Sequence, residues 1–341
     1  MSPVHLPAEW EKQTGVLISW PAKSTDWCNK LDEVEATYLE LTRQIAKYSL
    51  VYVCCSDPET MLHVRQLCNE NNITPGKLNI LSIPYDDTWV RDYGPISVRR
   101  VNEIVWLDFK FNAWGGRYPY QQDARLTRLL YRELFIDDRV LIDNTDFVLE
   151  GGSIDCDGIG TILTTSRCLL SAGRNPGLTK RQIEDRLIST LGVQRVLWLE
   201  HGQLAGDDTD AHVDTLARFC STDTITYVQC SSPVDPHYES LSEMEKQLES
   251  FVQMNGNPYR LIPLPLPDAC FNKEGQRLPA TYANFLIING AVLVPVYELN
   301  SDALALAQLH RCFPKHTIIP IQCRALLEQF GSLHCITMQI L

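Results

Sequence analysis

The sequence Val16-Leu17-Ile18-Ser19-Trp20 is a short apolar run of the kind that forms a buried β-strand. Residues 50–55 form a second such run and predict a second strand. Between the two runs, in residues 32–48, apolar side chains recur at spacings of three and four and predict an amphipathic helix: Val34, Tyr38, Leu41, Ile45 and Tyr48. A strand, a helix and another strand in succession predict an α/β fold.

The alternation of strands and helices continues along the chain. Further segments carry the same signals, with strands expected at residues 78–83, 96–98 and 317–321 and helices at residues 123–135, 238–254, 301–313 and 324–329. Thr179 and Gln182 fit a capping box, so a helix should begin at Thr179. Asn289-Gly290 between two apolar runs predicts a β-hairpin. The prolines from 258 to 267 predict one exposed loop.

The composition is that of a globular protein with no nucleic-acid or membrane partner. The 341 residues carry 30 basic and 42 acidic side chains, and the resulting charge of −12 repels phosphate backbones. No apolar stretch has the length of a membrane span, and the N-terminus does not resemble a secretory signal. No linker divides residues 1–341, so we expect a single domain. Because the N-terminus does not resemble a secretory signal, we expect the protein in the cytoplasm.

The 12 cysteines contain no Cys-x-x-Cys pair, which argues against a zinc ribbon or a redox motif. Several of them sit in apolar runs, as in Val51-Tyr52-Val53-Cys54-Cys55. We expect most of the cysteines to be reduced residues of the core.

Four clusters could carry chemistry, because each places acidic, His or Cys residues beside glycine, where a strand can turn out of its sheet. They are Asp86-Asp87-Thr88-Trp89-Val90-Arg91-Asp92-Tyr93-Gly94-Pro95, Glu150-Gly151-Gly152-Ser153, Gly206-Asp207-Asp208-Thr209-Asp210-Ala211-His212-Val213-Asp214 and Gly331-Ser332-Leu333-His334-Cys335-Ile336-Thr337.

His212 and Asp214 are two residues apart and would share one face of an extended segment. One could move protons while the other holds a cation. Two other interpretations stay open for this cluster. One is an acidic surface loop, and the other is a divalent-metal site formed by the cluster's acids and histidine: Asp207, Asp208, Asp210, His212 and Asp214. The spacing does not match an EF-hand.

Cys335 is a core cysteine or a nucleophile. A nucleophilic cysteine needs a histidine and an orienting polar group from distant parts of the sequence, and His212 and Asn284 are candidates. His334 would point to the opposite face of a strand and is a poor base for Cys335.

Asp92 and Glu150 add two carboxylates, and a ligand held by several carboxylates should be a cation. Guanidinium matches carboxylates with a planar fork of donors. Trp89 or Trp114 could stack on such a cation. Structural ion pairing of Asp92 and a simple turn at Glu150 are the alternatives.

Together these clusters resemble the agmatine deiminase and bacterial peptidylarginine deiminase family. The resemblance runs nearly end to end through motifs in the family's order: Pro7-Ala8-Glu9-Trp10-Glu11, Trp89-Val-Arg-Asp92-x-Gly-Pro, Phe111-Asn-Ala-Trp-Gly-Gly116, Glu150-Gly-Gly, His212-x-Asp214 and His334-Cys335-Ile336-Thr337. It implies the pentein fold, an α/β propeller of five pseudo-symmetric strand–helix units around a central funnel.

The resemblance also implies the roles of the site residues. Cys335 would be the nucleophile and His212 the general acid and base. Asp92 and Asp214 would grip the guanidinium, and Glu150 would tune His212 or help to bind the cation. Four further residues are expected to bind the substrate: Trp89, Trp114, Asp208 and Asn284.

The implied reaction needs no metal or organic cofactor. The Cys335 thiolate attacks the guanidinium carbon, His212 protonates the departing amine, and ammonia leaves a covalent thiouronium on the sulfur. Water activated by His212 then releases a ureido product. A cationic substrate itself favours the thiolate.

The substrate choice falls on agmatine, which would yield N-carbamoylputrescine in polyamine metabolism. Free arginine would need a cation for its carboxylate, and Arg117 and Arg174 are both expected at the surface. Peptidylarginine would need an open groove. Relative to plant agmatine deiminases, the segment from Gly206 to His212 is one residue shorter and the stretch from Pro263 to Asn284 is also shorter, so peptidylarginine and free arginine stay as alternatives. For the assembly of the protein, we keep a homodimer as an expectation.

Overall fold

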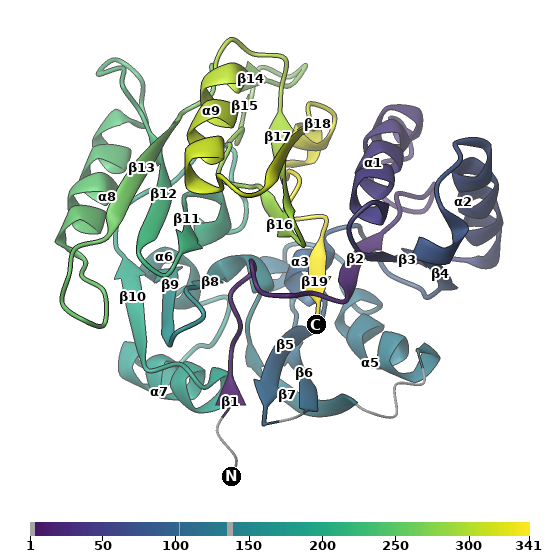
Figure 1. Cartoon of the computed structure of the whole chain (residues 1–341), viewed down its shortest axis with the longest axis horizontal. Helices are drawn as coiled ribbons and strands as arrows, with labels where there is room; N and C mark the ends of the chain where they lie inside the picture. The colour runs from purple at the N-terminus through teal and green to yellow at the C-terminus, as the bar shows by residue number, and fades with distance from the viewer. Residues whose placement is uncertain (1–3, 102, 135–138) are drawn as a thin grey trace.

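The computed structural model describes residues 4–101, 103–134 and 139–341. Its strands form mixed sheets arranged around the middle of the molecule, and the longer helices lie outside them (Figure 1). The two four-stranded sheets consist of β1 (Val4–His5), β5 (Ile96–Arg100), β6 (Glu103–Lys110) and β7 (Arg139–Val148), and of β19 (Met338–Ile340), β2 (Gly15–Ser19), β3 (Leu50–Cys55) and β4 (Leu78–Ser82).

Three further sheets have three strands each. They consist of β8 (Ile154–Cys156), β9 (Thr161–Thr165) and β10 (Arg195–Leu199), of β11 (Ala217–Ser221), β12 (Thr224–Gln229) and β13 (Arg260–Pro265), and of β16 (Leu286–Ile288), β17 (Ala291–Val296) and β18 (Thr317–Gln322). A small hairpin pairs β14 (Cys270–Phe271) with β15 (Arg277–Leu278).

The helices complete the list of elements. The α-helices are α1 (Leu31–Ala46), α2 (Pro58–Glu70), α3 (Val90–Tyr93), α4 (Ala113–Gly116), α5 (Asp123–Glu133), α6 (Ser166–Leu169), α7 (Lys180–Leu191), α8 (Tyr238–Ser250) and α9 (Asp302–Cys312). The 3₁₀ turns are η1 (Pro75–Lys77), η2 (Gly151–Ser153), η3 (Val213–Thr215) and η4 (Leu326–Gln329).

One topology recurs in the five larger sheets of the described chain. Each contains an antiparallel pair followed by a parallel pair, such as β11 with β12 and then β12 with β13. Each of these parallel pairs is joined through a segment that contains a helix, because parallel neighbours need a crossover connection: α1, α5, α7, α8 and α9. The C-terminal strand β19 pairs with β2, so the last strand of the chain joins the sheet of β2, β3 and β4.

The core forms where the sequence is apolar on the side facing the sheets. Strand β2 is buried along its whole length, and β3 is buried over all but its first residue. Helix α1 buries the predicted apolar positions Val34, Tyr38, Leu41 and Ile45. Most of the cysteines are buried free thiols, as predicted. No helix in the described part of the chain is long and apolar enough to cross a membrane.

Most predicted elements are confirmed. The capping box at Thr179 begins α7, and the Asn289-Gly290 turn joins β16 to β17 with Gly290 at φ 79°. Residue 135, at the end of the helix predicted for 123–135, lies outside the described residues. The helix predicted for 238–254 ends at Ser250.

The exposed loop predicted from the prolines at 258–267 is wrong. Pro263 and Pro265 belong to β13, and their neighbours Ile262 and Leu264 are buried. A strand tolerates these prolines because β13 is an edge strand, paired only with β12. Pro263 and Pro265 alternate with the residues whose backbone groups bond to β12, so their missing N–H groups cost the sheet nothing.

Candidate active site

One cavity of about 120 Å³ is lined by residues from the first, third and fourth sequence clusters, together with residues outside them. Its lining residues are Asp26, Asp87, Trp89, Asp92, Trp114, Tyr118, Asp207, Asp208, Thr209, His212, Thr215, Gln329, Phe330, Gly331 and Cys335. Of the predicted site residues, six line the cavity: Cys335, His212, Asp92, Trp89, Trp114 and Asp208. Asp214, Glu150 and Asn284 lie in the layer behind it, where each contacts a lining residue or its neighbour.

Gly152 is the point on which three of these side chains converge. A Cβ atom at this position would lie 2.7 Å from His212 Nδ1, 2.9 Å from Asp92 Oδ1 and 3.0 Å from Asp214 Oδ2. Only a glycine leaves room for the two carboxylates and the imidazole to come together here. The motif Glu150-Gly-Gly therefore has a steric function in addition to forming the turn η2.

Asp92 is fixed on both of its oxygens. The backbone N–H of Gly152 donates to Oδ1 at 2.9 Å, and the indole N–H of Trp114 donates to Oδ2 at 3.0 Å. Burial, together with the charges of Asp214 and Glu150, raises the pKa of Asp92 despite the opposing effect of His212. A cation entering the cavity would relieve this cost.

Asp214 keeps one oxygen free. Its Oδ2 lies 2.7 Å from His334 Nδ1, whereas Oδ1 is buried without a hydrogen-bond partner. Burial by itself would raise the pKa of Asp214, but the hydrogen bond and charge of His334 hold it below its usual range. Asp214 is therefore an ionised carboxylate with an unused acceptor beside Asp92.

His212 is buried between acidic groups. Its Nδ1 lies 3.6 Å from Asp92 Oδ1. Burial alone would lower the pKa of His212, but Asp92, Cys168 and Glu150 together raise it well above its usual value. This environment favours the protonated imidazole, which is the form that can act as a general acid.

Glu150 pairs with an arginine instead of facing the cavity. Its Oε1 accepts from Arg174 Nε at 3.0 Å, and both side chains are fully buried. Arg174 also bonds to Asp210, so two carboxylates compensate its desolvation. The surface position predicted for Arg174 is therefore wrong, whereas Arg117 is exposed as expected.

Cys335 is held by Asn284. The Asn284 Oδ1 atom accepts from the Cys335 thiol at 3.4 Å and from the backbone N–H groups of Cys335 and His334 at 3.3 and 2.9 Å. Burial and the charges of Asp214 and Asp92 raise the pKa of Cys335 well above its usual value. Without a cation in the cavity, Cys335 is therefore a neutral thiol.

The segment before β19 contradicts the strand geometry predicted for His334. Residues 333–336 form turns, and His334 points into the molecule between two carboxylates, Asp214 and Glu9. His212 and Asp214 likewise flank and enter the turn η3 instead of lying along an extended strand. In both cases a turn, and not a strand, brings the polar side chains to one centre.

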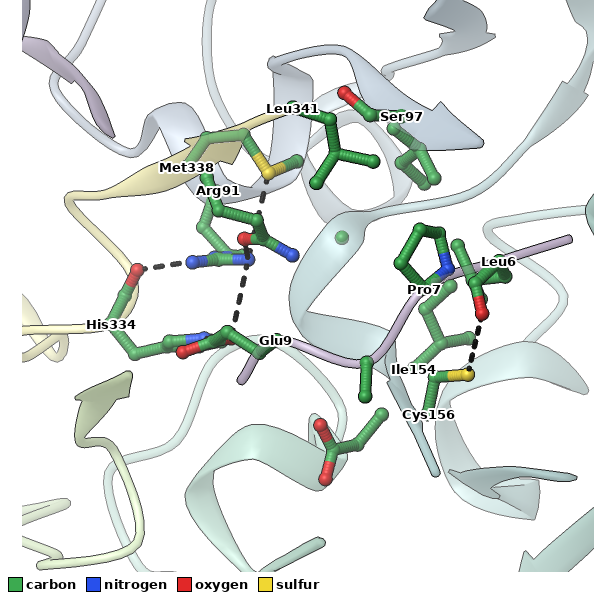
Figure 2. Close-up of a pocket in the computed structure, with 15 residues that line it drawn as sticks. Leu6, Pro7, Glu9, Arg91, Ser97, Ile154, Cys156, His334, Met338 and Leu341 are labelled. Carbon is green, nitrogen blue, oxygen red and sulfur yellow. Dashed lines mark hydrogen bonds and ion pairs between the residues drawn. The ribbon is translucent and has the colours of Figure 1, made fainter. Parts of the chain in front are cut away.

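A second, smaller cavity of about 50 Å³ lies behind this centre (Figure 2). Glu9 and His334 meet beside it, with His334 Nε2 2.7 Å from Glu9 Oε2. Arg218 Nη2 donates to the same Glu9 oxygen at 2.9 Å, and Arg91 Nε donates to the His334 carbonyl at 3.3 Å. Ionic contacts thus extend from the N-terminal segment through His334 to Asp214.

The two tryptophans form walls of the main cavity. Trp89 packs against Gly331, where a Cβ atom would overlap the indole at 2.1 Å. Trp114 adopts a left-handed backbone conformation, with φ 55°, in the turn α4. Asp210 and Ala211, just before His212, have φ 65° and 64°. Such strain is characteristic of functional sites, where the surrounding structure holds the backbone in place.

The acidic run from 207 to 214 does not converge as a metal site would. Asp207 accepts from the backbone N–H of Ala211 at 2.6 Å and closes the turn. Asp208 accepts from Tyr118 at 2.9 Å, and Asp210 pairs with Arg117 and Arg174. Because the carboxylates have separate partners, the geometry does not support the metal-site interpretation of this cluster.

Several residues around the site carry no recognisable signal in the sequence. Asp26, Tyr118 and Phe330 line the cavity but stand outside the four clusters or beside them. Glu9 could have been found, since it belongs to the motif Pro7-Ala8-Glu9-Trp10-Glu11, but nothing in the sequence says that it reaches His334.

The fold and the cavity are those of a guanidine-modifying enzyme with a cysteine, a histidine and paired carboxylates at its centre. The family model of Porphyromonas-type peptidyl-arginine deiminase matches residues 5–340, and the chain belongs to this family.

Curated and solved relatives of the chain carry the name agmatine deiminase. The agmatine deiminase of Medicago truncatula is 32% identical over 98% of this chain and 96% of its own. The solved C. jejuni agmatine deiminase with substrate bound is 34% identical, covers 99% of this chain and 96% of its own, and superimposes with a TM-score of 0.90. The crystal structure of a putative peptidyl-arginine deiminase is 41% identical, covers 100% of this chain and 99% of its own, and superimposes with a TM-score of 0.94.

Proposed function

We propose that the protein deiminates agmatine with water, giving N-carbamoylputrescine and ammonia. One arrangement carries the proposal: the thiol of Cys335, the imidazole of His212 and the carboxylate of Asp92 line one cavity. Asp214 lies next to Asp92 across Gly152. The names of the relatives, which include agmatine deiminases, agree with hydrolysis of an amidine C–N bond.

The guanidinium would lie between Asp92 and Asp214. The free Oδ1 of Asp214 can accept one of its N–H groups, and planar pairing with carboxylates is the preferred geometry of a guanidinium. Its positive charge opposes the two carboxylates that raise the pKa of Cys335. Substrate binding would thus convert the thiol to a thiolate, which is the reactive form.

The reaction would proceed through a covalent intermediate. The sulfur of Cys335 bonds to the guanidinium carbon, and the protonated His212 gives its proton to the departing nitrogen as the C–N bond breaks. Ammonia leaves and a thiouronium remains on the sulfur. Neutral His212 then takes a proton from water, whose oxygen attacks the same carbon and releases the ureido product.

Glu150, Asn284 and the tryptophans would support these steps. Glu150 keeps the pKa of His212 high through its charge, and Asn284 holds the thiol and the turn around it. Trp89 and Trp114 would enclose the flat cation, since both line the cavity.

The recurring sheet topology supports the finer description of the fold. We propose that the five larger sheets are the pseudo-equivalent units of a pentein-type propeller, because each repeats an antiparallel pair, a helix-containing crossover and a parallel pair. The cavity would then occupy the central funnel onto which the units converge.

The charge of the lining favours agmatine among the guanidines. Five aspartates line the cavity, namely Asp26, Asp87, Asp92, Asp207 and Asp208. Among the described lining residues there is no lysine or arginine to pair with the carboxylate of free arginine. A substrate with a second cation at its tail fits this lining best.

Peptidylarginine remains the second candidate, because the matching family model and a structure with a TM-score of 0.94 carry the name of that activity. A peptide would bring neutral amides to the position where agmatine brings an ammonium group. The acidic residues Asp87 and Asp208 would then have no charged partner in the substrate.

The decisive measurement is ammonia release from agmatine, free arginine and a blocked peptidylarginine. We expect turnover of agmatine, complete loss in Cys335→Ala and retention in Cys312→Ala, whose side chain is also only partly buried. Activity should be insensitive to EDTA. Loss on chelation with rescue by a divalent ion would instead support a metal-dependent hydrolase, and turnover of another guanidine would change the substrate alone.

The cellular setting is part of the same proposal. The free, mostly buried cysteines suit a reducing compartment such as the cytoplasm, where agmatine would feed putrescine and polyamine synthesis. The homodimer stays a prediction, which light scattering of the purified protein would test.

A further inference from the structure

Three buried side chains, one of them His212, form a compact group of possible metal ligands. One atom each from Glu150, Cys168 and His212 lies within 4.8 Å of the others. Within the described chain, this is the one group of three or more His, Cys, Asp or Glu residues that meets this criterion. All three side chains are at most 1% exposed.

Two atoms of this group have no hydrogen-bond partner. They are Oε2 of Glu150 and Nε2 of His212, both buried. The other carboxylate oxygen of Glu150 and the other ring nitrogen of His212 have partners. Glu150 Oε1 accepts from Arg174, and His212 Nδ1 faces Asp92. A buried polar atom without a partner costs free energy. A bound cation would satisfy both atoms at once, with the proton of His212 released to water because only the neutral imidazole binds a metal.

The ligand types indicate which cation would bind. A nitrogen, a sulfur and one carboxylate oxygen suit Zn²⁺ or a similar first-row ion better than Mg²⁺ or Ca²⁺. Bonds of about 2.0–2.3 Å in a tetrahedron place neighbouring ligand atoms roughly 3.5 Å apart. Because the three atoms already lie within 4.8 Å, small side-chain rotations would close the site.

The surroundings also match those of a metal centre. A histidine that binds a metal usually has a carboxylate on its other nitrogen, and a ligating carboxylate is usually held by a further donor. Asp92 and Arg174 occupy these two positions. The charge of Arg174 is balanced by its second partner, Asp210, so it does not exclude a cation. His212 lines the main cavity and offers the path of entry.

We propose that Glu150, Cys168 and His212 bind Zn²⁺, with water as a fourth ligand, and that this ion inhibits the enzyme by occupying His212. The inhibition rests on the proposed role of His212 in deimination, whereas the binding does not. Zinc held here engages Cys168 and leaves the nucleophile Cys335 free, which distinguishes this site from simple capture of the reactive thiol.

The first experiment measures binding without activity. In the full-length Cys335→Ala protein, Co²⁺ should produce a thiolate-to-cobalt absorption band. In Cys335→Ala/Cys168→Ala the intensity of this band should fall by the amount that one thiolate-bound cobalt ion per protein contributes. In Cys335→Ala/Cys54→Ala, which removes a buried thiol of β3, the intensity should not change. An unchanged band in the Cys168 variant would overturn the site, and this result does not depend on any turnover.

The second experiment measures inhibition of agmatine deimination by Zn²⁺, with each variant compared with its own metal-free activity. Loss of even an outer partner of a metal ligand weakens binding about tenfold or more, so Cys168→Ala should raise the half-inhibitory Zn²⁺ concentration by at least that factor. Cys54→Ala should leave it unchanged. Equal inhibition of both variants would contradict the proposal, and a cobalt band in a protein without turnover would contradict the proposed function alone.

Discussion

At the scale of single residues, the site is organised by charge that its substrate must balance. Asp92 and Asp214 lie beside one another, and they add to the burial that keeps Cys335 protonated. Cys335, the proposed nucleophile, is therefore a neutral thiol when no cation is bound. In the proposed mechanism a guanidinium ion activates the sulfur by its own charge, and reactivity toward other molecules stays low until that cation is bound.

This arrangement predicts an unusual behaviour for Asp92→Asn. Removing the carboxylate should abolish turnover but lower the pKa of Cys335, since one of the charges that raises it is gone. A lower pKa increases the fraction of thiolate at neutral pH. At pH 7, iodoacetamide should alkylate Cys335 faster in Asp92→Asn than in the wild type. Mass spectrometry of the peptide that contains Cys335 measures this rate. Slower alkylation would show that Asp92 does not act on the thiol.

A second prediction concerns Asp208 and the pH dependence of agmatine binding. Burial raises the pKa of Asp208 to about 6 and that of Asp87 to about 7. Both carboxylates are charged above these values, so kcat/KM for agmatine should fall as the pH is lowered through 7 and 6.

In Asp208→Asn the step near pH 6 should disappear. At pH 8 the KM should rise roughly five- to tenfold with little change in kcat, as expected for one partly buried charge pair. Methylguanidine, which has no cationic tail, serves as the control, and its kinetics should not change. An equal effect on both substrates would mean that Asp208 does not contact the tail.

At the scale of elements, the site is built from turns. The tight turn η2 carries Gly152, which has His212, Asp92 and Asp214 around it at distances that exclude a methyl group. The strands fix where these turns lie, and the turns fix where the side chains point. A small change in one turn should therefore disturb several functional groups together.

Gly152→Ala tests this directly. The added Cβ would lie 3.0 Å or less from one atom each of His212, Asp92 and Asp214, and all three would have to move. Displacements of about 1 Å in a catalytic centre reduce rates by about a hundredfold, so we expect at least that loss in kcat. Gly76→Ala is the matched control, because its Cβ would meet nothing within 4 Å. Wild-type turnover by Gly152→Ala would show that the centre tolerates the methyl group.

The elements also show what a sequence can predict. The capping box at Thr179 and the Asn289-Gly290 turn are local signals, and both predicted elements are confirmed. The prolines of β13 favour a loop when the sequence is considered alone, because a strand tolerates them only at a sheet edge. Which strand lies at an edge depends on neighbours distant in sequence. The glycines beside acidic, His and Cys residues are also local signals, and they indicate where the site lies.

The partners of the site residues could not be predicted in this way. Nothing in the sequence around Arg174 shows that this residue is buried between Glu150 and Asp210. His334 was assigned to a strand face, and only the turns before β19 reveal that it contacts Asp214. These contacts join residues 24, 36 and 120 positions apart, so they follow from the assembled fold.

At the scale of the whole molecule, ionic contacts tie the two ends of the chain to its centre. Glu9 contacts His334, 325 positions away, and Arg218, 209 positions away. The backbone N–H of Ile287 donates to the second Glu9 oxygen at 2.7 Å. One buried carboxylate thus connects the N-terminal segment with the sheet containing β16 and the turn that carries Cys335.

Glu9→Gln should therefore destabilise the whole fold. Burial would raise the pKa of Glu9, but His334 and Arg218 hold it well below its unfolded value, which is about 4.3. A depressed pKa contributes stability above the unfolded pKa, and this contribution is lost as the pH falls toward the folded one. At pH 7 the substitution removes one of the two carboxylates that pair with the buried Arg218 and leaves Asp155 as its remaining anion, at a cost of about 1.5–3 kcal/mol.

Urea unfolding at several pH values measures this difference. The gap in unfolding free energy between wild type and Glu9→Gln should be full from pH 7 down to about 5 and should narrow below about pH 4, as Glu9 of the unfolded wild-type chain becomes protonated. Glu11→Gln is the matched control, since Glu11 is half-buried and pairs only with partly exposed groups, and we expect a change of at most about 1 kcal/mol. If Glu9→Gln and Glu11→Gln unfold alike, the buried carboxylate does not hold the ends of the chain to the catalytic centre.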